Sequence, residues 1–493
     1  MKYFFTIILY AVITSSLVAQ TAADAFRYST QDIRGTARYL GVGGAMGALG
    51  TDYSVLSSNP AGLAVYRKSE FVLTPSLSSN KTTAQLVGTD NEAFDSPKNK
   101  FRLNSVGLVF NNKPRSAKWK TLNFAIGYNK IATYDQEFSY EGSTSGSMAE
   151  SYAEAANGLT NAQLDAFSTG LAYETGAIFS QGGASTYGTD FSGSANVPVR
   201  RTENITTTGG INELIFSLAS NYNNRLMFGL TLGVPFLDWK QDRVYREEDS
   251  ASDDIPFFNY LSYEEEIGTA GIGINAKFGL IYRFSQMLRL GLAVHSPTRF
   301  GLTDSFQSNL TYSFTESSNS GGVFTANSPD GSFNYRLRTP WRYLLSGAVL
   351  IKKFGFVSAE IEYTDFGTAA FNFQKDNPTV NFSASENQVN TTITDTYQSS
   401  LNFKLGAEYV YDKFQFRAGY NINGSAFATE KGTNSAISVG AGLRLEKFYI
   451  DAAYRFSMSS DEYKPYTTSF ASQPLVNTDL QKNDVLLTLG FRF

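Results

Sequence analysis

The chain has 493 residues, 42% of them hydrophobic, and a formal net charge of −4 at pH 7. This charge balance, with no dense run of lysine and arginine, argues against nucleic acid as a partner. The absence of cysteine excludes disulfides and thiolate metal sites. The mean hydropathy of −0.21 excludes a bundle of membrane-spanning helices.

Residues 1–19 have the pattern of a secretory signal peptide. Lys2 supplies the positive start, the run from Tyr3 to Val18 is apolar, and Ala19 is a small residue at the cleavage point before Gln20. The alternative is a retained membrane anchor, but the apolar run is shorter than the roughly 20 residues that a spanning helix needs. We therefore expect the mature protein to leave the cytoplasm.

Residues 20–67 are expected to form a compact hatch. Their small-residue-rich part carries Asn59, Pro60, Ala61 and Gly62 directly before the first strand-like run. The glycines of the GVGGAMG run do not follow a strand or open a βαβ unit, which argues against a dinucleotide-binding loop. We expect them to let the backbone of the hatch lie close to a surrounding wall.

From Ser69 onward the chain alternates between apolar and small or polar residues with a period of two, the pattern of strands with one apolar and one wet face. The chain also has many glycine (42), tyrosine (29) and phenylalanine (39) residues, a composition typical of outer-membrane β proteins. The fourteen predicted strands cover residues 69–80, 101–112, 119–134, 209–221, 225–243, 259–284, 287–303, 333–351, 354–373, 394–411, 414–428, 433–445, 448–459 and 481–493.

The connections between these strands alternate strictly between short turns and long polar loops, the longest being residues 135–208, which we expect to be partly helical over 148–176. This alternation is typical of outer-membrane barrels. We therefore predict an all-β fold, a 14-stranded antiparallel transmembrane β-barrel over residues 68–493, with both termini in the periplasm. A barrel of this width needs a plug, and the hatch is the candidate. The alternative is a soluble array of β-sandwiches.

The segment Gly35–Ala64 resembles the hatch signature of the FadL/OmpP1/TodX family of outer-membrane transporters of hydrophobic compounds. Weaker similarities follow in order along the chain, at Ser296-Pro297, Thr339-Pro340-Trp341 and Leu405–Tyr409. The resemblance implies passive uptake of long-chain fatty acids or aromatic hydrocarbons, which leave sideways through a gap in the barrel wall. It places that gap at a kinked third strand, beside the Asn-Pro-Ala element of the hatch.

Three sets of site residues follow. Asn59, Pro60, Ala61 and Gly62 are the candidate gate, or alternatively a tight turn that leads into the first strand. Gly127 is the candidate kink of the third strand, because glycine weakens a strand interior. An outer low-affinity groove for a hydrophobic ligand, or alternatively a simple loop helix, is expected at Leu159, Leu164, Phe167 and Leu171.

We expect no catalytic, cofactor or metal site. The single histidine, His295, cannot form a three-histidine zinc site, and no nucleophile motif accompanies it for serine-histidine hydrolysis. The acidic runs at Glu247–Asp249 and Glu264–Glu266 could hold a divalent cation but are expected to be solvated charges. The expected partners are a hydrophobic ligand, outer-membrane lipid with lipopolysaccharide, and the outer-membrane assembly machinery, whose signal the terminal Phe493 resembles. We expect a monomer.

Two functions remain open at this stage. The first is an outer-membrane channel for hydrophobic small molecules. The alternative is a non-transport barrel that serves protein secretion or surface attachment. An apolar pocket between hatch and wall would favour transport, and a polar or filled lumen would favour the alternative.

Overall fold

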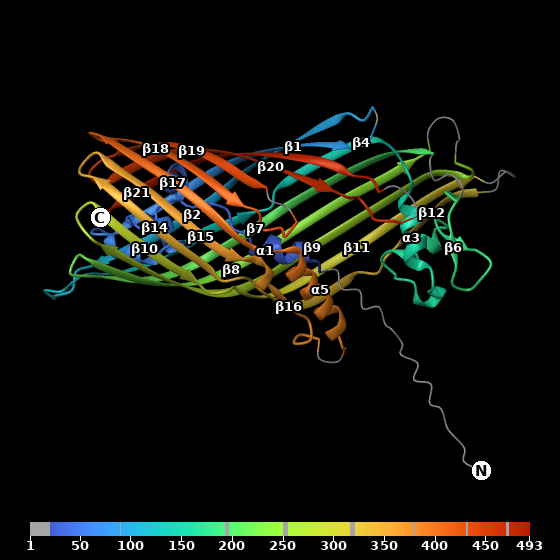
Figure 1. The fold of residues 1–493 in the computed structure, drawn as a ribbon, viewed down its shortest axis with the longest axis horizontal. Coiled ribbons are helices and arrows are strands. Elements are labelled where there is room, and N and C mark those ends of the chain that lie inside the picture. Colours follow the sequence, from blue (N-terminus) through green and yellow to red (C-terminus); the bar gives the residue numbers. More distant parts are fainter. Residues whose placement is uncertain are drawn as a thin grey trace, which may run out of the picture.

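The computed structural model describes residues 20–493 except 89, 193–196, 250–254, 316–320, 378–379, 430–431 and 470–472. The predicted signal peptide lies outside the described residues. Figure 1 shows a barrel from the side, with the C-terminus at one end and α3 and β6 at the other. None of the helices in the described part of the chain is long and apolar enough to cross a bilayer.

Fourteen antiparallel spans form the closed wall, and several of them consist of two strands in line. The wall closes where β1 pairs with β21, from Glu70↔Arg492 to Leu86↔Val476. In order around the barrel the spans are β1 (Glu70–Leu86), β2 (Ala93–Asn112), β3 (Trp119–Thr133) with β4 (Gln136–Ser145), β7 (Pro198–Tyr222), β8 (Leu226–Glu248), β9 (Phe258–Arg283), β10 (Leu288–His295) with β11 (Arg299–Thr315), β13 (Gly331–Arg338) with β14 (Arg342–Ile351), β15 (Gly355–Asp365) with β16 (Ala370–Asn372), β17 (Ser399–Tyr411), β18 (Phe414–Gly424), β19 (Thr433–Arg444), β20 (Phe448–Tyr463) and β21 (Val476–Arg492).

The predicted alternation is confirmed as an apolar outer face and a polar inner face. On β7, Leu214, Phe216 and Leu218 are exposed, whereas Glu213 and Ser217 on the alternate positions are buried. Apolar side chains on the outside of a membrane barrel contact lipid, and the inward residues are free to be polar. The lumen therefore contains most of the buried charges of the wall.

The hatch lies inside this wall and consists of short helices joined by tight turns, seen in blue in Figure 1. They are α1 (Ala22–Ser29), α2 (Ala37–Gly41) and the 3₁₀ helices η1 (Tyr53–Leu56) and η2 (Pro60–Val65). Residues 34–50 are buried almost without exception. Contact with the wall is made backbone to backbone. A methyl group on Gly419 of β18 would collide with the backbone of Gly43, which has a φ of 61°.

The long connections lie at the end of the barrel opposite the tight turns. They contain α3 (Met148–Ala156), η3 (Asn161–Gln163), α4 (Thr169–Glu174), β5 (Phe179–Ser180), β6 (Tyr187–Gly188), β12 (Gly321–Asn327), η4 (Phe366–Thr368) and α5 (Ser383–Thr396). The helices within residues 148–176 are as predicted. The strand β7 begins well before its predicted start and β8 continues beyond its predicted end, to 25 and 23 residues, whereas β9, with 26 residues, covers nearly the range predicted for it.

The predicted strand 394–411 is wrong at its start, because residues 394–396 belong to helix α5. The sequence of α5 is rich in threonine and asparagine, which do not favour a helix. Val389 and Ile393, four residues apart, turn one face of α5 toward the aromatic cluster around α1, where Ile393 is buried. Tertiary packing therefore sets this helix, which lies beside β16 in Figure 1 and contacts α1.

Candidate functional site at the hatch

The turn at Asn59–Gly62 is held against the wall by its own side chain and by wall glycines. Asn59 caps η2 by accepting a hydrogen bond from the Ala61 amide (3.1 Å), and its Nδ2 donates to the carbonyls of Gly47 (2.6 Å) and Leu280 (3.3 Å). A methyl group on Gly279 of β9 would collide with the Asn59 side chain. The four residues predicted as a gate thus lie together, packed mainly against β7, β8 and β9.

Gly127 lies on the third strand beneath a hatch tyrosine. It pairs with Gly107 of β2, and the two glycines make room for the ring of Tyr53, whose hydroxyl donates to the Val106 carbonyl (3.2 Å). The ladders on both sides of β3 run through Gly127 without a register shift. The nearest irregularity of this strand is four residues further on, at Ile131.

Two bulges face each other where the pairing of β2 with β3 ends. Its last pair is Ser105↔Asn129. Next to it, Asn104 is an extra residue of β2 opposite β1, and Ile131 is an extra residue of β3 opposite β7. Bulges bend a strand and end its pairing, and they are common next to functional sites. Beyond this point no backbone pairing between β2 and either β3 or β4 occurs in the described residues.

The hatch satisfies the backbone groups that this interruption leaves free. The amide of Asp32 donates to the Ile131 carbonyl (2.9 Å), and the Asp32 carboxylate accepts from the Thr133 amide (3.1 Å). On the opposite edge, the Asn104 side chain donates to the Gly35 carbonyl. Unpaired backbone groups are costly in a membrane wall. The segment around Asp32 therefore takes the place of a strand partner.

Side chains close the rest of the seam between β2 and β4. Arg102 forms an ion pair with Asp135, and Lys98 pairs with Glu137 at 2.8 Å. Further out, the hydroxyls of Ser96 and Ser139 are 3.1 Å apart. We use the name aperture for the gap between the bulges at Asn104 and Ile131, with the Arg102–Asp135 pair at its edge. Side chains and the hatch occupy it, not a continuous backbone ladder.

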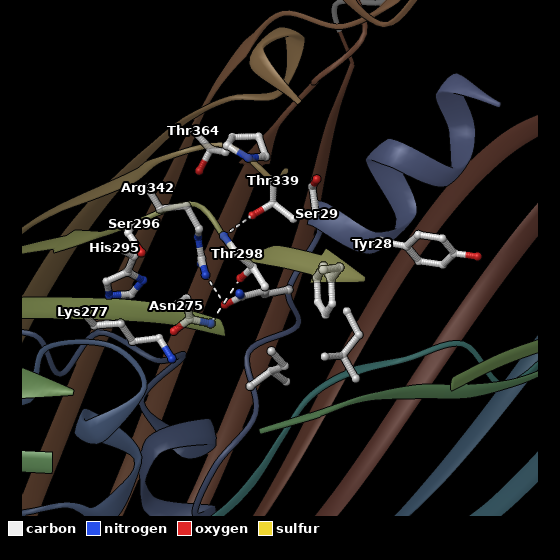
Figure 2. Close-up of a pocket in the computed structure, with 15 residues that line it drawn as sticks. Tyr28, Ser29, Asn275, Lys277, His295, Ser296, Thr298, Thr339, Arg342 and Thr364 are labelled. Carbon is white, nitrogen blue, oxygen red and sulfur yellow. Dashed lines mark hydrogen bonds between the residues drawn. The ribbon is translucent and has the colours of Figure 1, made fainter. Parts of the chain in front are cut away.

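A polar cavity of about 60 Å³ lies behind the aperture, between hatch and wall. At about 10–15 Å³ for each water it has room for a few water molecules. A second, smaller cavity adjoins it, and Figure 2 shows Lys277, His295 and Arg342 along one side of this space with Tyr28 of α1 opposite. The lining of the larger cavity includes Asp32, Arg34, Asn129, Lys130, Ile131, His295, Arg342, Glu362, Asn402 and Lys404.

Most of the charges around these cavities are paired. Lys277 contacts Glu213 at 2.5 Å, and Lys404 bridges Glu360 (3.0 Å) and Glu362 (2.7 Å). Lys130 differs, because its ammonium donates to the Asn212 amide oxygen (2.6 Å) and contacts no carboxylate of the described residues within ion-pair distance. It is the cation best placed to meet an anionic group at the aperture.

The charged side chains of Arg38 and Asp32 hold the hatch against the wall. Arg38 donates to both carboxylate oxygens of Glu408 (2.8 and 2.9 Å), a bidentate pair. Burial by itself would raise the pKa of the Asp32 carboxyl, but the nearby cations Lys482, Arg34 and Arg455 lower it to about 2. Asp32 is therefore ionised at neutral pH, as its role at the aperture requires.

The four residues predicted to form the outer groove do not lie together in one pocket. Leu171 is buried in the loop core, and Leu159 and Leu164 are half-buried. Phe167 alone of the four lines a pocket of about 250 Å³, together with Tyr263, Ile267 and Phe306 from the inner faces of β9 and β11. The rings of Phe167 and Phe306 meet edge to face at 4.8 Å. This pocket is mainly apolar and lies where loop residues 165–168 meet β9 and β11.

Glu247 of β8 and His295 of β10 have surroundings that the sequence did not indicate. Glu247, expected to be a solvated charge, is fully buried and lies 3.5 Å from the guanidinium of Arg201. The described residues contain no cluster of three or more side chains suited to a metal. His295 places its Nε2 at 2.6 Å from the Ser58 carbonyl, so its ring is engaged by the hatch backbone and not by a serine hydroxyl.

Comparison with known proteins identifies the relatives of this barrel. The toluene transporter TodX of Pseudomonas putida is 14% identical, covers 94% of this chain and 99% of its own, and has a TM-score of 0.51. A FadL homologue of Pseudomonas aeruginosa is 12% identical, with 94% and 100% coverage and a TM-score of 0.53. At these identities the likeness concerns the fold. No curated protein matched the chain.

The family model described as outer membrane protein transport protein (OMPP1/FadL/TodX) matches residues 14–493, nearly the whole chain. That match and the closed fourteen-strand wall with its internal hatch agree with each other. The chain therefore belongs to this family of outer-membrane transport proteins.

Proposed function

We propose that this protein is a passive channel of the outer membrane for hydrophobic small molecules, which leave the lumen sideways through the aperture. The observation that carries the proposal is the pair of opposed bulges at Asn104 and Ile131, with a cavity directly behind them. Only side chains and hatch residues need to move there, because no ladder hydrogen bonds join the two edges. The proposal requires no energy coupling.

The route begins at the apolar pocket around Phe167 and Phe306, which lies at the long-loop end. We propose that this end is outside the cell and that the tight turns and both termini are periplasmic. A ligand would then pass along α1 to the cavity beside Lys130 and Ile131 and move out between β2 and β4. The turn at Asn59–Gly62 would act as an anchor that holds the hatch while residues 32–35 shift.

The lining of the inner cavity favours a ligand with an anionic end. Of the two ligand classes that the family resemblance implies, a long-chain fatty acid has a carboxylate and an aromatic hydrocarbon does not. Lys130 lies beside the aperture without a carboxylate partner among the described residues. Arg34 and Arg342 also line the cavity, but each is paired with a carboxylate. A desolvated cation stabilises a carboxylate through a charge-assisted hydrogen bond. We therefore propose fatty acids as the substrate class.

Uptake by cells that lack their own long-chain fatty acid transporter tests this function. The protein should restore uptake of a radiolabelled long-chain fatty acid. Lys130→Met, which removes the charge and keeps most of the length of the side chain, should lower fatty acid uptake about tenfold, the effect of losing roughly 1.4 kcal/mol. Lys118→Met in an exposed turn is the matched control. Labelled toluene is the comparison ligand. Toluene uptake without fatty acid uptake would contradict the substrate class.

One observation favours the second candidate, a barrel that serves protein secretion or surface attachment. The space between hatch and wall is polar and nearly filled, with room for only a few waters. If neither fatty acid nor toluene enters faster than in cells without the protein, while the barrel is folded in the membrane, the transport proposal fails and this second function stands.

A further inference from the structure

The outward side chains of β13 and β14 change in kind along the strand. From the long-loop end they run through Asn334, two arginines, two aromatic residues and then aliphatic residues down to the tight turn. The ten residues of β14 rise about 3.3 Å each along the strand. Because barrel strands are tilted, β14 spans about 25 Å of the bilayer, which is the height of a lipid-facing band. In order the side chains are Asn334, Arg336, Arg338, Trp341, Tyr343, Leu345, Val349 and Ile351.

The aromatic pair marks the edge of this band. The rings of Trp341 and Tyr343 stack at 6.4 Å, and Tyr343 lies 6.3 Å from Tyr363 on the next strand. Aromatic girdles of membrane barrels lie at the level of the lipid headgroups. Arg336 and Arg338 follow directly beyond this girdle, so they lie where lipid phosphates are found.

A third arginine joins them from the neighbouring strand. Arg299 of β11 pairs directly opposite Arg338, and Gly301 pairs opposite Arg336. A Cβ atom on Gly301 would meet nothing within 4 Å, so the surface is hollowed between the arginines. The resulting open groove has a volume of about 410 Å³ and is lined by Arg299, Gly301, Thr303, Asn334, Arg336 and the carboxylate of Asp376. Arg338 lies at its border, directly opposite Arg299. We call it the arginine groove.

The described residues balance the charges around the arginine groove only in part. Arg336 forms a bidentate pair with Asp376 (2.9 and 3.0 Å). Arg338 reaches only the Thr368 carbonyl (3.4 Å), and Arg299 has no hydrogen-bond or ion-pair partner among the described residues. Like charges directly opposite each other destabilise a sheet. An anion between Arg299 and Arg338 would remove this repulsion.

We propose that the arginine groove binds the phosphate groups of a phosphorylated glycolipid of the outer leaflet, of the lipopolysaccharide type. Arginine suits phosphate because its planar fork makes two hydrogen bonds at once. A lipid is favoured over a free anion because the neighbours toward β9 are apolar. Ile274 pairs opposite Arg299 and Ile272 opposite Gly301, and both are about half exposed, so acyl chains can pack beside the bound phosphate.

The proposal rests on the orientation proposed above, with the long-loop end outside, but not on transport. Its test uses the purified full-length protein in detergent and measures binding of fluorescent lipopolysaccharide. The test variant is Arg299→Gln with Arg338→Gln. The control is Arg115→Gln with Lys353→Gln, which removes the same charge at the opposite end of the barrel. Retained heat-modifiable migration on a gel shows that each variant is folded.

Each arginine near a lipid surface is expected to contribute about fivefold in affinity, so the test variant should bind roughly 30-fold more weakly. The control should bind like the natural protein, and enzymatically dephosphorylated lipopolysaccharide should bind as weakly as the test variant does. Inorganic phosphate should not compete at millimolar concentration. Equal binding by both variants, or no effect of dephosphorylation, would overturn the proposal. Competition by inorganic phosphate would show a free-anion site in its place. Fatty acid uptake is measured separately, so failure of either proposal leaves the other standing.

Discussion

Asn59→Ala should loosen the turn that anchors the hatch, by an amount that follows from its contacts. The substitution removes the cap of η2, which typically costs about 1 kcal/mol and at most about 2. It also removes the 2.6 Å hydrogen bond to the buried Gly47 carbonyl, and an unsatisfied buried group costs about 1–3 kcal/mol. Together these losses come to about 2–4 kcal/mol.

Hydrogen exchange of the turn measures this loss. At 1.4 kcal/mol for each factor of ten, local opening should become about 30-fold to 700-fold more frequent. The Gly62 amide is the reporter, because its acceptor is the backbone carbonyl of residue 59, which alanine retains (2.9 Å). Its exchange rate in detergent micelles should rise by that factor, while amides of the continuous β7–β8 ladder stay unchanged.

Asn309→Ala is the matched control, because Asn309 is a half-buried asparagine of β11, far from the hatch turn in sequence, that bonds Asn327 across the β11–β12 pair. Exchange at Gly62 should not respond to it. If Asn59→Ala leaves the Gly62 amide as protected as in the natural protein, the turn is not held by this side chain and the reasoning is refuted.

Three further predictions concern the hatch and the outer pocket. Gly107→Ala should weaken the hatch by about 1–3 kcal/mol, because its methyl group collides with the Tyr53 ring, and combining it with Tyr53→Leu should recover most of that loss in hatch exchange. Because the pKa of Asp32 is lowered from about 3.8 to about 2, its stabilisation is complete above pH 4 and disappears as pH falls toward 2. The protection of amides near residue 32 from hydrogen exchange should fall over the same pH range, and in Asp32→Asn this protection should not change with pH. Phe167→Ala should weaken ligand binding at the outer pocket and leave the loop folded. Truncation of the buried Leu171 to alanine should instead lower the stability of the loop by about 2–5 kcal/mol and unfold its helices. Hydrogen exchange and binding titrations together distinguish the two effects.

The wall was predictable from sequence because the alternating residues of each strand reflect the two environments that its two faces meet. Lipid outside and a polar lumen inside impose the alternation seen on β7, and the tight turns divide the spans. The hatch was predictable from its small residues, which match wall glycines such as Gly419. These features depend on local composition, which a single chain displays.

The aperture was not predictable to the residue. Gly127 suggested a bend, yet the bulges lie at Asn104 and Ile131, and neither residue type marks a bulge by itself. A bulge depends on the register of two neighbouring strands, which the sequence of one strand does not display. For the same reason α5 and the buried Glu247 were missed. Both depend on partners far away in the chain, such as the aromatic cluster around Phe26 and the guanidinium of Arg201.

In the proposed route, cargo leaves between β2 and β4. Cysteines in place of Arg102 and Asp135, whose side chains meet across the aperture, can be joined by a short bismaleimide in a chain that has no other cysteine. The matched pair is Ser217→Cys with Thr231→Cys, whose hydroxyls are 2.6 Å apart in the continuous β7–β8 ladder. Fatty acid uptake should fall to background when the first pair is cross-linked and remain intact when the second is. Full uptake through a barrel cross-linked between residues 102 and 135 would contradict the lateral exit.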